Sequence, residues 1–188
     1  MLEEILIAGF GGQGILSTGQ LLAYAAMEEN KHVAWIPSYG PEMRGGTANC
    51  GVTISDRPIS SPLVTEPTCL IAMNGPSLGK FEDCVVPGGL ILLNSSLVKT
   101  RVKRADARVL AIPANDIAEE IGNSKVAGNV MLGAYLGISG AVAVDSVVKA
   151  LAKVLPPRRH KLIPVNRQAL ERGASLGEEF RRGGAAVG

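Results

Sequence analysis

Short apolar runs and longer amphipathic stretches alternate along most of the chain. An apolar run of about 4–8 residues bounded by turn residues is typical of a buried strand, whereas apolar residues spaced about three or four apart are typical of a helix. The pattern predicts strands over residues 5–8, 33–36, 48–55, 70–73, 90–93 and 109–112. It predicts helices over residues 15–29, 76–83, 116–121, 128–136, 146–155 and 166–180.

Local signals add detail to this pattern. Asp116 and Asp145 stand at the start of two helical stretches and are expected as their N-caps. The connection between residues 36 and 48 is too short for a crossover helix, so the strands it joins are expected to pair antiparallel. The many small residues over 128–136 suggest a closely packed helix. Strands alternating with helices favour the α/β class, as a three-layer α/β/α sandwich with a mostly parallel, mixed sheet.

Chain length sets the expected domain organisation. A chain of 188 residues suits one domain with a substantial core, and residues 1–180 are expected to form it. Residues 181–188 are rich in glycine and are expected to form a flexible tail. The hydrophobic content of 46% excludes a disordered protein.

Charge and hydropathy exclude several classes of partner. The formal net charge is +2, from 19 basic and 17 acidic residues, which is too balanced for a nucleic-acid-binding stripe or a membrane-surface patch. No apolar run reaches the roughly 18 residues of a membrane span, and the first residues lack the basic region of a signal peptide. We therefore expect a cytoplasmic protein that binds neither nucleic acid nor a membrane.

The sequence offers little chemistry of its own. Cys50, Cys69 and Cys84 are scattered and odd in number, so neither a disulfide framework nor a four-thiolate cluster is expected from this chain. They are expected instead as small buried residues. His32 and His160 are not flanked by a nucleophile and an acid. We therefore predict no catalytic residue and no metal ligand within this chain.

A glycine-rich turn follows the first predicted strand and opens the first predicted helix. Its spacing fits the dinucleotide-binding pattern, but the acidic or basic residue expected after the second strand is missing, since the chain reads WIPS over residues 35–38. Three interpretations remain open: a nucleotide-binding loop, a tight turn that needs glycine for backbone clearance, and a loop that shapes a neighbouring active site. The candidate cofactor-binding residues are Gly9, Gly11, Gly12, Gln13 and Gly14.

A second segment combines turn residues with charge. Gly40 and Pro41 precede Arg44 and the pair Gly45 and Gly46, all within a short connection between apolar runs. Proline lacks a backbone donor and glycine favours positive φ, so the segment cannot continue a helix or a central strand. The guanidinium group forms bidentate contacts with carboxylates or phosphates. The segment is therefore predicted to be a surface loop that carries function.

Residues 38–50 read SYGPEMRGGTANC, which resembles the signature of the gamma subunit of 2-oxoacid:ferredoxin oxidoreductases. This subunit is equivalent to one domain of single-chain pyruvate:ferredoxin oxidoreductase. Further matching stretches are GFGGQGI at 9–15, VTISD at 52–56, ISSP at 59–62, PGG at 87–89 and NSS at 94–96. The resemblance runs in order from residue 3 to about residue 180.

The resemblance implies an accessory or assembly subunit that is inactive alone. The complex would decarboxylate a 2-oxoacid oxidatively to its acyl-CoA and pass the electrons to ferredoxin. Alpha, beta and ferredoxin-like delta subunits would be its partners. Thiamine diphosphate, Mg²⁺, iron–sulfur clusters and coenzyme A would act in the assembled complex, so the resemblance implies no complete cofactor site within this chain. The sequence of residues 38–50 looks closer to the 2-oxoglutarate and branched-chain (2-oxoisovalerate) types of the family than to the pyruvate type.

The same resemblance gives the surface loop three possible roles. It contacts another subunit, it contributes to coenzyme A or substrate access, or it is an internal scaffold. The residues concerned are Ser38, Tyr39, Glu42, Arg44, Gly45 and Gly46. Two other identities stay open: a stand-alone nucleotide-binding module that uses the 9–14 glycine loop, and an indolepyruvate oxidoreductase beta chain, against which the wording of residues 38–50 argues.

Overall fold

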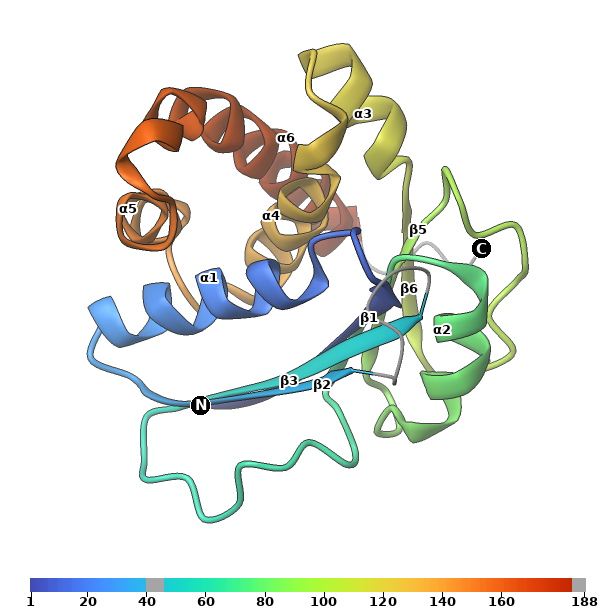
Figure 1. The fold of residues 1–188 in the computed structure, drawn as a ribbon. Helices are drawn as coiled ribbons and strands as arrows, with labels where there is room; N and C mark the ends of the chain where they lie inside the picture. Colours follow the sequence, from blue (N-terminus) through green and yellow to red (C-terminus); the bar gives the residue numbers. More distant parts are fainter. Residues whose placement is uncertain (40–45, 184–188) are drawn as a thin grey trace.

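A mixed sheet organises the computed structural model, which describes residues 1–39 and 46–183 (Figure 1). Within these residues six strands form one sheet in the order β2-β3-β1-β4-β5-β6. The strands are β1 (Leu2–Phe10), β2 (His32–Tyr39), β3 (Thr47–Ser55), β4 (Cys69–Ala72), β5 (Leu90–Asn94) and β6 (Arg108–Ile112). Every predicted strand is present, and β1 and β2 are longer than predicted because their ends pair with β3.

The sheet has a parallel half and an antiparallel half. β4 pairs parallel with β1 and β5, and β5 pairs parallel with β6. β3 pairs antiparallel with both β1 and β2. The predicted antiparallel pairing and the predicted mixed α/β sheet are therefore confirmed.

Helices cover both faces of this sheet. They are α1 (Ile15–Glu28), α2 (Gly75–Phe81), α3 (Ala114–Ile121), α4 (Ala127–Ser139), α5 (Val144–Val154) and α6 (Ile163–Gly183). Figure 1 shows α1, α4, α5 and α6 together on one side, with α2 on the other side against the parallel strands. Among the helices of the described residues, none has the length and apolar character needed to cross a membrane.

Three boundaries correct the sequence prediction. α3 begins at Ala114 and α5 at Val144, so Asp116 and Asp145 lie in the first turns and not at the N-caps. Both positions still suit an acid, because the first turn carries the positive end of the helix dipole. α6 continues to Gly183, three residues into the segment predicted as a tail, and residues 184–188 lie outside the described part.

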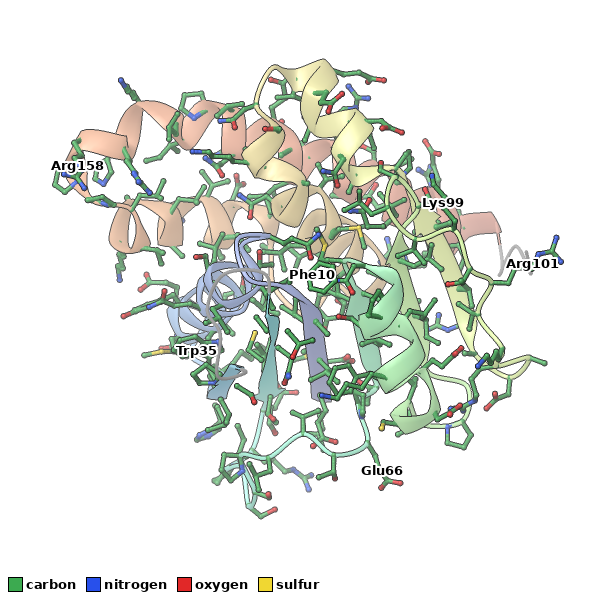
Figure 2. All side chains as sticks on the ribbon, turned by 45° about the vertical axis from the view of Figure 1, so that its right-hand side comes forward. Phe10, Trp35, Glu66, Lys99, Arg101 and Arg158 are labelled. Atoms are coloured by element: carbon green, nitrogen blue, oxygen red, sulfur yellow. The ribbon has the colours of Figure 1, made fainter. Side chains whose placement is uncertain are left out.

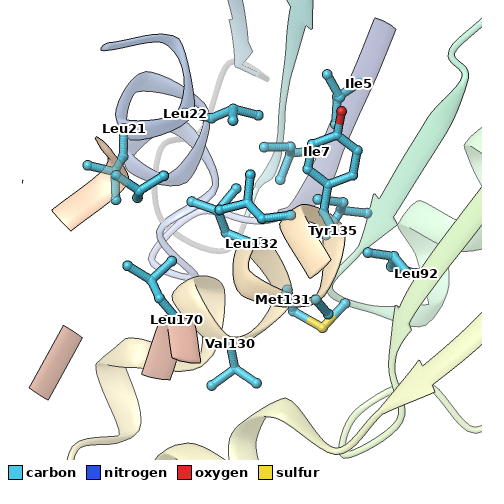
Figure 3. Close-up of a cluster of buried hydrophobic side chains, with 14 of the residues drawn as sticks. Ile5, Ile7, Leu21, Leu22, Leu92, Val130, Met131, Leu132, Tyr135 and Leu170 are labelled. Carbon is cyan, nitrogen blue, oxygen red and sulfur yellow. The ribbon is translucent and has the colours of Figure 1, made fainter. Parts of the chain in front are cut away.

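The main core lies between the sheet and α4. Ile5 and Ile7 of β1 pack toward Leu132 and Tyr135 of α4, as Figure 3 shows. Tyr135 is fully buried, and its hydroxyl group donates a hydrogen bond to Glu3 Oε2 at 3.2 Å. Burial raises the pKa of Tyr135 well above its ordinary value. α4 is therefore a central helix, buried by the sheet on one side and by α6 on the other.

Glycines bring α4 and α6 unusually close. A Cβ atom added to Gly133 or Gly137 of α4 would overlap backbone carbonyl oxygens of α6. A Cβ atom added to Gly173 or Gly177 of α6 would overlap those of α4 in the same way. The close packing predicted for residues 128–136 is confirmed, and α6 is the partner helix.

Candidate functional site

The carboxyl ends of the parallel strands meet at one edge of the sheet, and an amide side chain follows each of them. Gln13 follows β1, Asn74 follows β4, Asn94 closes β5 and Asn115 follows β6. Ligands of open α/β sheets bind outside this edge. The run of amides identifies the edge as the candidate site.

Gln13 ties the glycine loop to the next strand. Its Oε1 accepts hydrogen bonds from the Phe10 backbone N–H at 2.7 Å and from Asn74 Nδ2 at 3.2 Å. Its Nε2 donates to the Met73 carbonyl oxygen at 3.5 Å. Asn74 in turn caps α2, because its Oδ1 accepts from the Ser77 N–H at 2.9 Å. The loop after β1 and the turn after β4 are thus held as one unit.

A second amide pair lies further along the edge. Asn94 is fully buried, and its Nδ2 donates to Asn115 Oδ1 at 2.7 Å. Within the described residues, Asn94 Oδ1 has no hydrogen-bond partner. A buried carboxamide oxygen without a partner carries a desolvation cost, so this position holds unused hydrogen-bonding capacity beside the site.

Backbone clearance explains the glycines of the loop. A Cβ atom on Gly9 would lie 2.5 Å from Gln13 Oε1 and 2.9 Å from Met73 Cβ, so any larger residue would displace the Gln13 carboxamide. Gly14 precedes α1 with φ at 76°, a left-handed conformation that favours glycine. The free N–H groups at the start of α1 make this end of the loop attractive to anions.

A cavity of about 610 Å³ lies beside the loop. Its walls come from the start of α1, the turn before α4, the end of α5 and the start of α6. Lys125 and Arg159 bring positive charge to it, and Asn129 donates to Asn166 Oδ1 across it from α4 to α6. A smaller cavity of about 360 Å³ shares Gly12, Gly14 and Ser17 with it and extends to the start of β3.

Sequence reasoning found the glycine loop but missed the rest of this cavity. The missed residues are Asn115, Lys125, Asn129, Arg159 and Asn166. One available signal was the asparagine after each of the apolar runs 70–73, 90–93 and 109–112. The other lining residues come from helices far apart in the sequence, and no local pattern connects them.

The structure joins two of the predicted groups. The Gly11 N–H donates to the Gly46 carbonyl oxygen at 2.9 Å, so the glycine loop lies directly against Gly46 of the family signature at residues 38–50. Ser38 is exposed near the end of β2, and Tyr39 is the last residue of that strand. Glu42, Arg44 and Gly45 lie outside the described residues, so their predicted role stays a prediction.

Sheet order argues against a dinucleotide site at the glycine loop. In the dinucleotide-binding fold, the strand that carries the ribose-binding acid is the parallel neighbour of the first strand. Here antiparallel β3 lies between β1 and β2, which moves the end of β2 one further strand away from the loop. The missing acid and the strand order together leave the stand-alone nucleotide-binding module disfavoured.

The cysteines do not form a metal centre. Cys50 and Cys69 are buried, as predicted, whereas Cys84 is exposed, which corrects its predicted burial. Burial raises the pKa of Cys50 to about 12 and also raises the pKa of Cys69. Within residues 1–39 and 46–183, no group of three or more His, Cys, Asp or Glu side chains is arranged to hold a metal ion.

The comparison with known proteins agrees with this fold. A model of the pyruvate ferredoxin/flavodoxin oxidoreductase family matches residues 4–176. The chain belongs to this family. The solved gamma subunit of a keto/oxoacid ferredoxin oxidoreductase from Geobacter sulfurreducens superposes with a TM-score of 0.80 and 28% identity, covering 94% of this chain and 99% of that one. The predicted resemblance to the family's gamma subunit is confirmed.

The match covers very different shares of two curated relatives in this family. The ketoisovalerate oxidoreductase subunit VorA of Methanothermobacter thermautotrophicus is 40% identical over 94% of this chain, yet the match spans only 36% of that protein. The 2-oxoglutarate synthase subunit KorC of Methanocaldococcus jannaschii is 39% identical, covering 83% of this chain and 85% of its own. The matched domain thus makes up most of the KorC chain, whereas in VorA it is part of a much longer polypeptide.

Proposed function

We propose that this chain is the gamma subunit of a thiamine-diphosphate-dependent 2-oxoacid:ferredoxin oxidoreductase. The complex converts a 2-oxoacid and coenzyme A into an acyl-CoA and carbon dioxide, and the electron pair released passes to ferredoxin. The substrate is 2-oxoglutarate or a branched-chain 2-oxoacid, in keeping with the names of the 2-oxoglutarate and ketoisovalerate relatives. The observation that carries the proposal is the family match over residues 4–176.

The redox groups of the complex belong to its other chains in this proposal. An iron–sulfur cluster needs four ligands, commonly thiolates. This chain has three cysteines, of which Cys50 and Cys69 are buried in the core. The residues present therefore do not fit a cluster, and alpha, beta and ferredoxin-like delta subunits are proposed to carry the thiamine diphosphate, its Mg²⁺ and the clusters.

The cavity beside the glycine loop supports a role in coenzyme A binding. Coenzyme A carries phosphates, an adenine and a chain of amides. Phosphates suit the start of α1 and the side chains of Lys125 and Arg159, while amides suit the side-chain carboxamides of the edge. We propose that this cavity holds part of coenzyme A in the assembled complex.

A charge-removing variant tests this role. Lys125→Ala in the complex should raise the KM for coenzyme A several-fold and leave the KM for the 2-oxoacid unchanged. Lys149 is an exposed lysine on α5 outside the cavity, so Lys149→Ala is the matched control. Equal effects of the two variants on the KM for coenzyme A would place the cofactor elsewhere.

The role proposed for Arg44, in the family signature at residues 38–50, rests on the sequence alone. Arg44 is proposed to serve assembly or the shared active site, because charged residues between turn formers favour an outward-facing loop. Arg44→Ala should leave the melting temperature of the isolated chain nearly unchanged and weaken co-purification with partner chains. A large loss of the chain's own stability would instead make Arg44 an internal strut.

Activity of the purified proteins tests the function as a whole. The isolated chain should show no 2-oxoacid-dependent reduction of viologen and no iron–sulfur absorbance. A complex purified through a tag on this chain should reduce viologen when given coenzyme A and either 2-oxoglutarate or 3-methyl-2-oxobutanoate. Substantial turnover by the isolated chain would overturn the accessory role.

A further inference from the structure

Among the described residues, no helix covers one face of β2 and β3 (Figure 1). α1 packs on the other face, where the Trp35 ring lies against Gly19 of that helix. On the open side, Figure 1 shows the segment 56–66 crossing beneath β2 and β3. A Cβ atom on Gly51 of β3 would contact Val64 of this segment, which confirms the side on which it lies. We refer to this surface, with segment 56–66, as the open face.

Large apolar side chains are exposed on the open face. Ile36 pairs with Gly51, so its side chain points to the same side, and it is 37% exposed. Leu2 lies on that side too, since it is four residues before Leu6, which also pairs with Gly51, and it is 56% exposed. Leu63 of the crossing segment is 60% exposed. Large apolar side chains exposed on the same side of a sheet suit a surface that contacts another protein.

Segment 56–66 has little internal support. Only Ile59 and Val64 are half-buried, and the other residues of the segment are exposed, including Glu66, whose side chain points away from the fold in Figure 2. Among the hydrogen bonds of the described residues, the single one donated by a backbone N–H between residues 58 and 66 runs from Leu63 to Ser61 Oγ, at 3.4 Å. The remaining N–H groups are open to solvent or to a partner.

A cavity of about 420 Å³ lies under the start of this segment. Thr53 lines it, is 1% exposed, and has an Oγ1 atom without a hydrogen-bond partner in the described residues. Leu2 and Ile59 contribute apolar surface to its lining, and Arg57 and Glu4 contribute charge. The cavity therefore fits an apolar side chain that brings one hydrogen-bonding group toward Thr53.

We propose that the open face docks the companion polypeptide that corresponds to the part of VorA lying outside this domain. The inference rests on the proposed function. The VorA match spans only 36% of that protein, so a larger unit accompanies the same domain there and needs a surface on which to pack. The ISSP stretch at 59–62, part of the family resemblance, lies in the crossing segment. The partner surface is expected to be mostly apolar, with hydrogen-bonding groups for the free amides and for Thr53.

Paired variants on opposite sides of the domain test this proposal. The probe is the polypeptide, from the organism of this chain, that matches the part of VorA outside this domain. Its dissociation constant for this chain is measured by calorimetry. Leu63→Lys should weaken binding at least about tenfold, because it places a charge in an apolar contact. Met27 on α1 is 58% exposed, so Met27→Lys is the matched control and should change the dissociation constant less than about twofold. Melting temperatures of both variants should match wild type.

Hydrogen exchange supplies an independent readout on the unaltered chain. Amides of residues 59–66 should exchange rapidly in the isolated chain and become protected in the complex. Wild-type affinity of Leu63→Lys, with no protection of these amides, would overturn the docking surface while leaving the proposed function intact. A wild-type chain that does not bind the companion at all would overturn both. An isolated chain that dimerises, and that Leu63→Lys returns to a monomer, would assign the face to a second copy instead.

Discussion

The contact between α4 and α6 gives the sharpest stability prediction. A Cβ atom on Gly173 would overlap the Val130 carbonyl oxygen and lie 2.9 Å from the Ala134 nitrogen. These are backbone atoms of a central helix, so they cannot rotate away as a side chain would. Gly173→Ala therefore forces α4 and α6 apart. Because the cavity beside the glycine loop lies between the starts of these helices, the substitution should also disturb the site.

Two opposing effects set the size of the change. Overpacking a core costs about 1–3 kcal/mol, and the upper end applies here because backbone must move. Alanine is about 1 kcal/mol better than glycine in a helix interior. The expected loss in unfolding free energy is therefore about 2 kcal/mol. For a domain of this size, that corresponds to a fall in melting temperature of about 4–8 °C.

Gly79 in α2 provides the control for this prediction. A Cβ atom there meets nothing within 4 Å, so Gly79→Ala gains helix propensity without steric cost. Its melting temperature should stay level or rise by about 2–4 °C, as followed by circular dichroism or calorimetry. The reasoning is refuted if Gly173→Ala melts at or above the wild-type temperature.

Three further predictions concern polar groups of the isolated chain. Thr53→Val removes an unpartnered buried hydroxyl and should raise the unfolding free energy by up to about 1 kcal/mol in urea denaturation, whereas a loss would reveal a hidden partner. Cys84 should react with a thiol reagent in the folded chain, and the two buried cysteines only after unfolding; labelling of a second thiol in the native state would contradict their burial. Arg104 lowers the pKa of Asp106 to about 2, so the stabilisation is present above the ordinary value of about 4 and is lost as pH falls toward 2; an NMR titration midpoint near 4 would show that the pair does not form in solution.

Much of the fold followed from local patterns. Continuous apolar runs identified β1, β4 and β5 because these strands are buried by helices on both faces or by neighbouring strands. The short connection after β2 was enough to predict its antiparallel partner. The predicted start of α5 was less accurate, because Ala143 occupies the N-cap position that Asp145 was expected to fill.

The site was harder to predict because it depends on strand order. Nothing in the local pattern places β3 between β1 and β2, yet that position separates the end of β2 from the glycine loop. Asn94 and Asn115 become neighbours only once β5 and β6 are adjacent. The open face was missed for a related reason, since its apolar residues come from β1, β2 and a segment without secondary structure.

Reconstitution tests the central claim most directly. The companion chains of the complex would be purified without this chain and assayed for viologen reduction with coenzyme A and a 2-oxoacid, then assayed again after this chain is added. The account predicts little turnover before the addition and restored turnover after it, in a complex that contains this chain in stoichiometric amount. Full turnover without the chain, or an added chain that neither binds nor restores activity, would contradict its assignment as the gamma subunit of a 2-oxoacid:ferredoxin oxidoreductase.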